Sequence, residues 1–87
     1  MHAVVVRVTI NDPDAATSFL RENVVPRVSQ APGFVAGYWT RKENSGLSMA
    51  VFETEDAANQ AREQVRRMAP EAVTVEDVEV REVVASA

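Results

Sequence analysis

Few side chains in this sequence could do chemistry, and they are scattered along it. His2 is the only histidine, and an imidazole can act as a general base near neutral pH. It lies at the extreme N-terminus, where chains fray, so we expect a surface residue before the first strand. The serines have no neighbouring histidine, so the sequence gives no support for serine–histidine–aspartate catalysis.

The aromatic residues are the main candidates for a binding site. Three of the five lie within six positions, as Phe34, Tyr38 and Trp39. Trp39 could stack on a planar ligand, Tyr38 could donate a hydrogen bond, and Asn11 could orient a carbonyl group. Adjacent strand residues point to opposite faces, so Tyr38 and Trp39 cannot line the same pocket. The alternative for each is packing in the core or in an interface.

Two arginines, Arg7 and Arg41, fall within predicted strands. An arginine that faces a dimer interface is expected to pair with a carboxylate of the other chain, for which Glu53, Glu79 and Glu82 are available. Alternatively, its guanidinium could hold an anionic ligand through two nitrogens. The carboxylates of residues 76–82 are divided between both strand faces and predict a solvated edge, with no metal site.

Composition limits the possible classes of function. With 87 residues, we expect a single domain over residues 1–87 with a thin core. There is no cysteine, which excludes disulfides, thiolate metal sites and cysteine nucleophiles and fits a cytoplasmic location. The net charge is −4, and the basic residues are dispersed, which argues against nucleic acid as a partner. No apolar run is long enough to span a bilayer, so no membrane partner is expected.

Strands are predicted where β-branched and aromatic residues alternate. The first covers residues 3–10, with Val4, Val6, Val8 and Ile10 on its core face. Residues 34–42 and 47–53 predict a hairpin around a turn at 43–46, with Phe34 and Tyr38 on the same face. The last strand, about 77–84, follows a change of phase at Glu76 and Asp77, which predicts a bulge, a turn or two short strands.

Two amphipathic helices are predicted between these strands. The first follows a cap at Asn11 or Asp12, and Pro26 predicts a kink or a restarted final turn. The second, in residues 54–70, is capped by Thr54 and carries small residues on its apolar stripe. The order β-α-β-β-α-β predicts an α+β, ferredoxin-like sandwich: a four-stranded antiparallel sheet with both helices on one face.

Two helices leave the other sheet face uncovered. Either Phe34 and Tyr38 or Val35 and Trp39 should lie on it, with Val5 beside them. An apolar face of this kind usually marks an interface, so we expect a homodimer through the open sheet face.

A resemblance to a known protein family rests on the order of the elements and on three segments. These segments are APGFVAGYWTR (31–41), MAVFETEDAANQA (49–61) and VEVREVVA (78–85). The chain resembles the dimeric α/β-barrel proteins, in particular the antibiotic biosynthesis monooxygenase-like domains, over nearly its whole length. The resemblance implies a homodimer with a pocket between each sheet and its helices. The family that the chain resembles includes cofactor-independent oxygenases of aromatic polyketides and quinols. The family also includes haem-degrading enzymes with an iron-ligating histidine in the second half of the domain. Residues 54–70 of this chain contain no histidine.

Two functional hypotheses follow. In the first, the chain is a small-molecule-binding or non-catalytic module that takes a small aromatic ligand. In the second, it is a cofactor-independent monooxygenase of an aromatic or quinol-like substrate. Neither requires a cofactor or a metal. The candidate ligand-binding residues are Trp39, Tyr38, Asn11 and Arg7.

Overall fold

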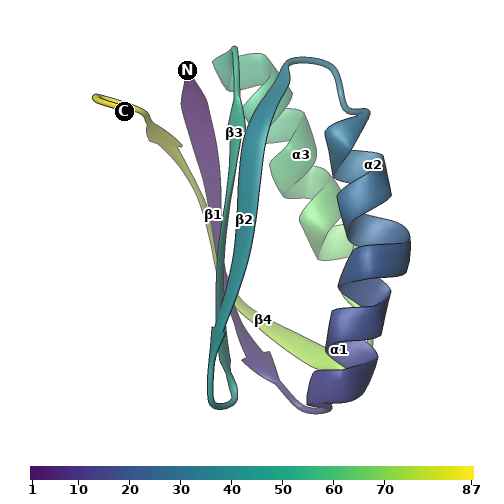
Figure 1. Cartoon of the computed structure of the whole chain (residues 1–87). Helices are drawn as coiled ribbons and strands as arrows, with labels where there is room; N and C mark the ends of the chain where they lie inside the picture. Colours follow the sequence, from purple (N-terminus) through teal and green to yellow (C-terminus); the bar gives the residue numbers. More distant parts are fainter.

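The computed structural model describes all residues, 1–87. Its sheet has the order β2-β3-β1-β4, and every neighbouring pair is antiparallel. Figure 1 shows the helices together on one side of the sheet. The predicted ferredoxin-like α+β fold is confirmed. The elements in chain order are β1 (His2–Ile10), α1 (Pro13–Phe19), η1 (Leu20–Val24), α2 (Val25–Ser29), β2 (Phe34–Lys42), β3 (Ser45–Phe52), α3 (Glu55–Met68) and β4 (Val73–Glu82).

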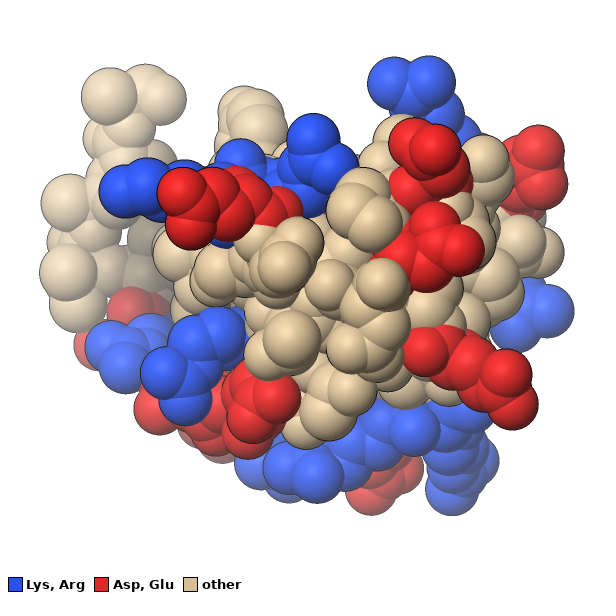
Figure 2. All heavy atoms as spheres, turned by 90° about the horizontal axis from the view of Figure 1, so that it is seen from below, with Lys and Arg blue, Asp and Glu red and all other residues tan.

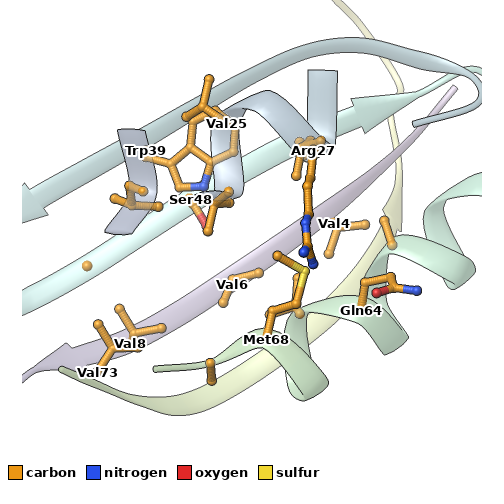
Figure 3. A pocket seen from close by; sticks show the side chains of 18 of the residues that line it. Val4, Val6, Val8, Val25, Arg27, Trp39, Ser48, Gln64, Met68 and Val73 are labelled. Carbon is orange, nitrogen blue, oxygen red and sulfur yellow. The ribbon is translucent and has the colours of Figure 1, made fainter. Parts of the chain in front are cut away.

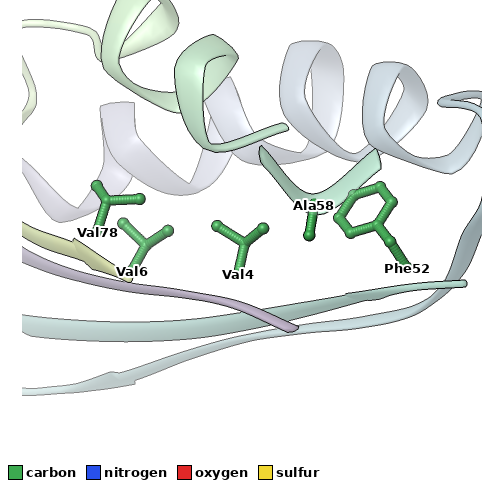
Figure 4. Close-up of a cluster of buried hydrophobic side chains, with 5 residues drawn as sticks. All are labelled: Val4, Val6, Phe52, Ala58 and Val78. Atoms are coloured by element: carbon green, nitrogen blue, oxygen red, sulfur yellow. The ribbon is translucent and has the colours of Figure 1, made fainter. Parts of the chain in front are cut away.

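The core lies between the sheet and α3. Its buried cluster joins Val4 and Val6 of β1 and Val78 of β4 to Phe52 and Ala58, as Figure 4 shows. Phe52 and Ala58 are fully buried, because the small alanine lets α3 sit directly on the sheet. The hydroxyl oxygen of Thr54 accepts a hydrogen bond from the N–H of Ala57 at 3.1 Å, and Thr54 therefore caps this helix as predicted.

The first helical segment is irregular around Pro26. Asp12 caps α1, because its side chain accepts a hydrogen bond from the N–H of Ala15 at 3.2 Å. The segment then widens into the single π-helical turn η1, in which the N–H of Val25 donates to the carbonyl of Leu20. Proline lacks an N–H and crowds the preceding turn, and the wider turn accommodates it. Regular α2 then restarts with Pro26 in its first turn, which confirms the predicted restart.

The β2–β3 hairpin differs from the prediction in two ways. Lys42 pairs with Ser45, so the turn consists of Glu43 and Asn44 alone and Gly46 belongs to the strand. A register shift lies between Phe34 and Ala36. The extra residue of this bulge reverses the expected side of Phe34, which packs edge-on against Phe52 with ring centroids 5.9 Å apart. The expectation that Phe34 shares a face with Tyr38 was therefore wrong.

The bulge predicted near Glu76 is present. Arg7 pairs with Asp77 and Val8 with Val75, which leaves Glu76 unpaired. The bulge keeps Val73 and Val75 on the same side as Val78, so β4 is one continuous strand. It begins earlier than the predicted residues 77–84.

The other face of the sheet carries no helix. Tyr38 is 70% exposed there, and its partner Met49 and the neighbouring Leu47 are about half exposed. Beside this apolar strip, on β1 and β4, lie Arg7 and the ion pair of Arg81 with Glu79. Seen from below, acidic and basic side chains are interspersed around uncharged residues (Figure 2). No helix has the length and apolar character needed to cross a bilayer.

Candidate functional site

A cavity of about 760 Å³ lies between the sheet and the helices. Small-molecule sites usually measure about 300–1,000 Å³, so this space would hold a molecule of several rings. The helix-facing side chains of β1 and β3 form its floor. The first helical segment, which comprises α1, η1 and α2, forms one wall, and α3 forms the other. Figure 3 shows the floor and both walls. Of its 33 lining residues, 22 are hydrophobic.

The cavity exists because side chains that could fill it are small. Along β3 the floor is made by Gly46, Ser48 and Ala50, and along α3 the wall begins with Ala57 and Ala61. The two helical segments are also placed differently. α3 lies against β1, β3 and β4, whereas the first segment meets the sheet mainly where α2 approaches β2. The space between them is left open.

Trp39 is the aromatic side chain of β2 that lines this cavity. It reaches from the strand toward the first helical segment, where Val25 lies (Figure 3). Its ring folds back over Gly37, the preceding residue on the same face. A Cβ at Gly37 would come within 2.9 Å of the indole ring, so the glycine makes room for the ring in this position.

The polar side chains of the cavity are hydrogen-bond donors or neutral groups. The polar lining residues are Thr17, Arg21, Arg27, Thr40, Arg41, Ser48, Gln60 and Gln64, besides the indole of Trp39. No carboxylate, imidazole, phenol or thiol lines the cavity. The site can therefore enclose an apolar ring system and donate hydrogen bonds to its oxygens, but it presents no side chain suited to general-base catalysis.

The four predicted site residues do not come together. Trp39 lines the cavity, whereas Tyr38 points to the open face, which confirms that the two lie on opposite sides. Asn11 is exposed, and its amide donates to the carbonyl of Glu71 at 3.3 Å and the hydroxyl of Thr74 at 3.1 Å. It fastens the end of β1 to the start of β4. Arg7 is exposed on the open face opposite Leu47 and Asp77.

The sequence suggested that His2 lies before the first strand, but the structure places it within that strand. It is the first residue of β1 and only partly exposed, with Nε2 3.5 Å from Oε2 of Glu55. Its Nδ1 is buried without a hydrogen-bond partner. His2 does not line the cavity.

The polar residues on the cavity walls were not among the residues predicted from the sequence. Gln60 and Gln64 are one turn apart on α3, and Arg21 and Arg27 flank the apolar stripe of the first segment. The available signal was position, since polar residues at the margin of a helical apolar stripe reach the edge of whatever the stripe covers. The π-turn before Pro26 shifts that stripe, so a regular helical period does not place these arginines.

No family model matches the sequence, and no curated protein matches it. Among solved structures, SnoaB, a cofactor-independent oxygenase from Streptomyces nogalater, here in a mutant form, aligns with a TM-score of 0.75 and 22% identity. The alignment covers 98% of this chain and 94% of SnoaB. The two chains share the ferredoxin-like arrangement of strands and helices described above. At this level of identity, the likeness establishes the fold and leaves the activity to the site.

Two further structures share this fold. A dimeric ferredoxin-like protein from an uncultured marine organism aligns with a TM-score of 0.60, 10% identity and coverage of 100% and 98% of the two chains. MhuD, a haem degrader from Mycobacterium tuberculosis, solved with two haems in its active site, gives 0.55, 22% identity, and 97% and 98%.

The lining of this cavity does not fit a haem whose iron is held by a protein side chain. Haem iron is usually held by histidine, alone or together with methionine, by a thiolate or by a phenolate. Met68 lines the cavity, but no histidine, cysteine or tyrosine does. No group of three or more histidine, cysteine or acidic side chains is arranged to hold a metal ion.

Proposed function

We propose that the chain is a homodimeric small-molecule-binding module whose cavity takes an apolar, ring-bearing ligand against Trp39. The observation that carries the proposal is the cavity of about 760 Å³ with a mainly hydrophobic lining. Burial of apolar ligand surface supplies about 25 cal/mol per Å². The hydroxyl of Ser48 and the amides of Gln60 and Gln64 would fix the orientation of the ligand through its oxygens.

The dimer forms through the open sheet face in this proposal. Tyr38, Leu47 and Met49 are 70%, 52% and 45% exposed and lie together across β2 and β3. Two copies packed face to face about a two-fold axis would cover this strip on both. The dimeric ferredoxin-like protein with the same fold supports self-association, and the exposed strip is what supports this face.

A second candidate function is a cofactor-independent monooxygenase of an aromatic or quinol-like substrate, and the near-complete structural match to SnoaB favours it. In the balanced reaction, an activated ring methylene and one molecule of dioxygen give a ring carbonyl and one molecule of water. The substrate supplies the electrons, one oxygen atom becomes the carbonyl and the other leaves as water. This chain would orient the substrate, exclude water and stabilise its anion by donated hydrogen bonds. No side chain of the cavity can accept the substrate proton, so it would pass to water.

The single tryptophan provides the test, because no other indole contributes to the fluorescence. We would titrate the protein with naphthoquinols and anthrones and follow the emission of Trp39. A saturable change is expected, and it should persist in Tyr38→Ala, which alters only the open face. An unresponsive Trp39 with all ligands would contradict ligand binding. Oxygen consumption with a bound anthrone would then separate the oxygenase from the binding module.

A further inference from the structure

All the charged side chains that line the cavity are arginines. Arg21, Arg27 and Arg41 line it and no acidic residue does, although the chain has 13 acidic and only 9 basic residues. The cavity is therefore positively charged inside a protein of net charge −4.

None of these three arginines has a partner in the protein. The contacts of salt-bridge distance in the chain join His2 to Glu55 and Arg81 to Glu79. No side-chain hydrogen bond involves Arg21, Arg27 or Arg41 either. Their guanidinium groups are consequently available to a ligand.

The arginines lie beside the apolar surfaces of the cavity. Figure 3 shows Arg27 directed from α2 into the space between the helices, toward Met68 of α3. Arg41 lies two residues beyond Trp39 on the same face of β2. A ligand stacked on the indole and packed over the valine floor would bring a substituent at its edge within reach of a guanidinium.

We infer that the ligand is an amphipathic anion: an apolar ring system that bears a carboxylate or a chemically similar group. This inference rests on the proposed ligand-binding function and names the class of ligand. A guanidinium binds such a group through two parallel hydrogen bonds. The three arginines are solvent-exposed at the edge of the apolar lining, so each contact has the modest strength of an exposed charge pair.

Two fluorescent probes with the same rings separate the apolar from the anionic contribution. 1-Anilinonaphthalene-8-sulfonate carries a sulfonate, and N-phenyl-1-naphthylamine lacks it. We would measure both dissociation constants by probe fluorescence on the intact protein. The sulfonate should bind about tenfold more tightly, because each exposed charge pair contributes up to roughly fivefold. Ala61→Phe, which fills the cavity, should weaken both probes.

Two triple variants of equal net charge, each with three arginines replaced by glutamine, test the role of the cavity arginines. Neutralisation of the cavity arginines should remove the preference for the sulfonate and leave the neutral probe unchanged. Neutralisation of three exposed arginines of α3 that do not line the cavity should leave the preference intact. The two variants are Arg21→Gln/Arg27→Gln/Arg41→Gln and Arg62→Gln/Arg66→Gln/Arg67→Gln.

The outcomes distinguish the two levels of the proposal. If neither probe binds, or if Ala61→Phe changes neither, the cavity is not a ligand site and the proposed function fails with the inference. If the neutral probe binds in the cavity but the sulfonate gains nothing, ligand binding stands and the anionic class is overturned. A preference that both triple variants lower equally would reflect net charge alone and would also overturn it.

Discussion

The dimer interface can be disrupted by a single charge at Leu47. This residue lies on β3 in the apolar strip of the open face, paired with Thr40 and Arg7. Its side chain points away from the helices, so a polar replacement leaves the core of the folded chain unaltered. We predict that Leu47→Asp dissociates the dimer and leaves the protomer folded.

The magnitude follows from the exposure of Leu47. Full burial of a leucine side chain contributes about 1.5–3 kcal/mol. Leu47 is 52% exposed. Burying this exposed half in the interface contributes about 1 kcal/mol in each copy, or about 2 kcal/mol per dimer. The two carboxylates that replace it must also lose water, and we assign about 1 kcal/mol more to each, at the low end for a poorly compensated polar group. The sum of about 4 kcal/mol corresponds to a roughly thousandfold weaker dimer.

Sedimentation equilibrium over a range of concentrations measures this change. Ser18→Asp is the matched control, because it adds the same charge on the exposed surface of α1, outside the cavity. The control should dimerise like the original chain, and circular dichroism should show both variants folded. Unaltered dimerisation of Leu47→Asp, or an original chain that is monomeric at all concentrations, would refute sheet-to-sheet association.

Two glycines give further predictions. A Cβ at Gly46 would come within 2.6 Å of a methyl carbon of Val8, so Gly46→Ala should cost about 1–3 kcal/mol of unfolding free energy. For a domain of this size the melting temperature in calorimetry should fall by about 5–20 °C, and an unchanged value would disprove the close strand contact. Gly37→Ala should displace the indole of Trp39, shift its emission and weaken probe binding severalfold with the fold retained. Ala36→Ser, on the opposite face, should alter neither, and an equal effect of the two substitutions would contradict the placement of the ring.

The sequence was sufficient to predict the arrangement of the elements. Alternation along β1 identified the core face. A cap at Asn11 or Asp12 and another at Thr54 marked the starts of the helices, and Pro26 predicted the kink or restarted turn. These signals are local, since each depends on neighbouring residues or on a short period. The opposite orientation of Tyr38 and Trp39 followed from the same alternation.

The features that the sequence could not provide depend on contacts between distant segments. The bulge before Ala36 turned Phe34 toward Phe52, and nothing in residues 34–36 marks the pairing register with β3. The cavity depends on how far the first helical segment stands from the sheet. The π-turn then determines which arginines reach the cavity, so Arg21 and Arg27 could not be recognised from helical spacing.

Nuclear magnetic resonance with N-phenyl-1-naphthylamine tests most directly whether the cavity is a ligand site. The single indole N–H of Trp39 and the methyl groups of Val6 and Ala61 report on the cavity, and the ring of Tyr38 and the methyl group of Met49 report on the open face. Our account predicts saturable shifts of the first group at one common affinity, with the second group unchanged. Shifts confined to Tyr38 and Met49, or no saturable shift at Trp39, would contradict it.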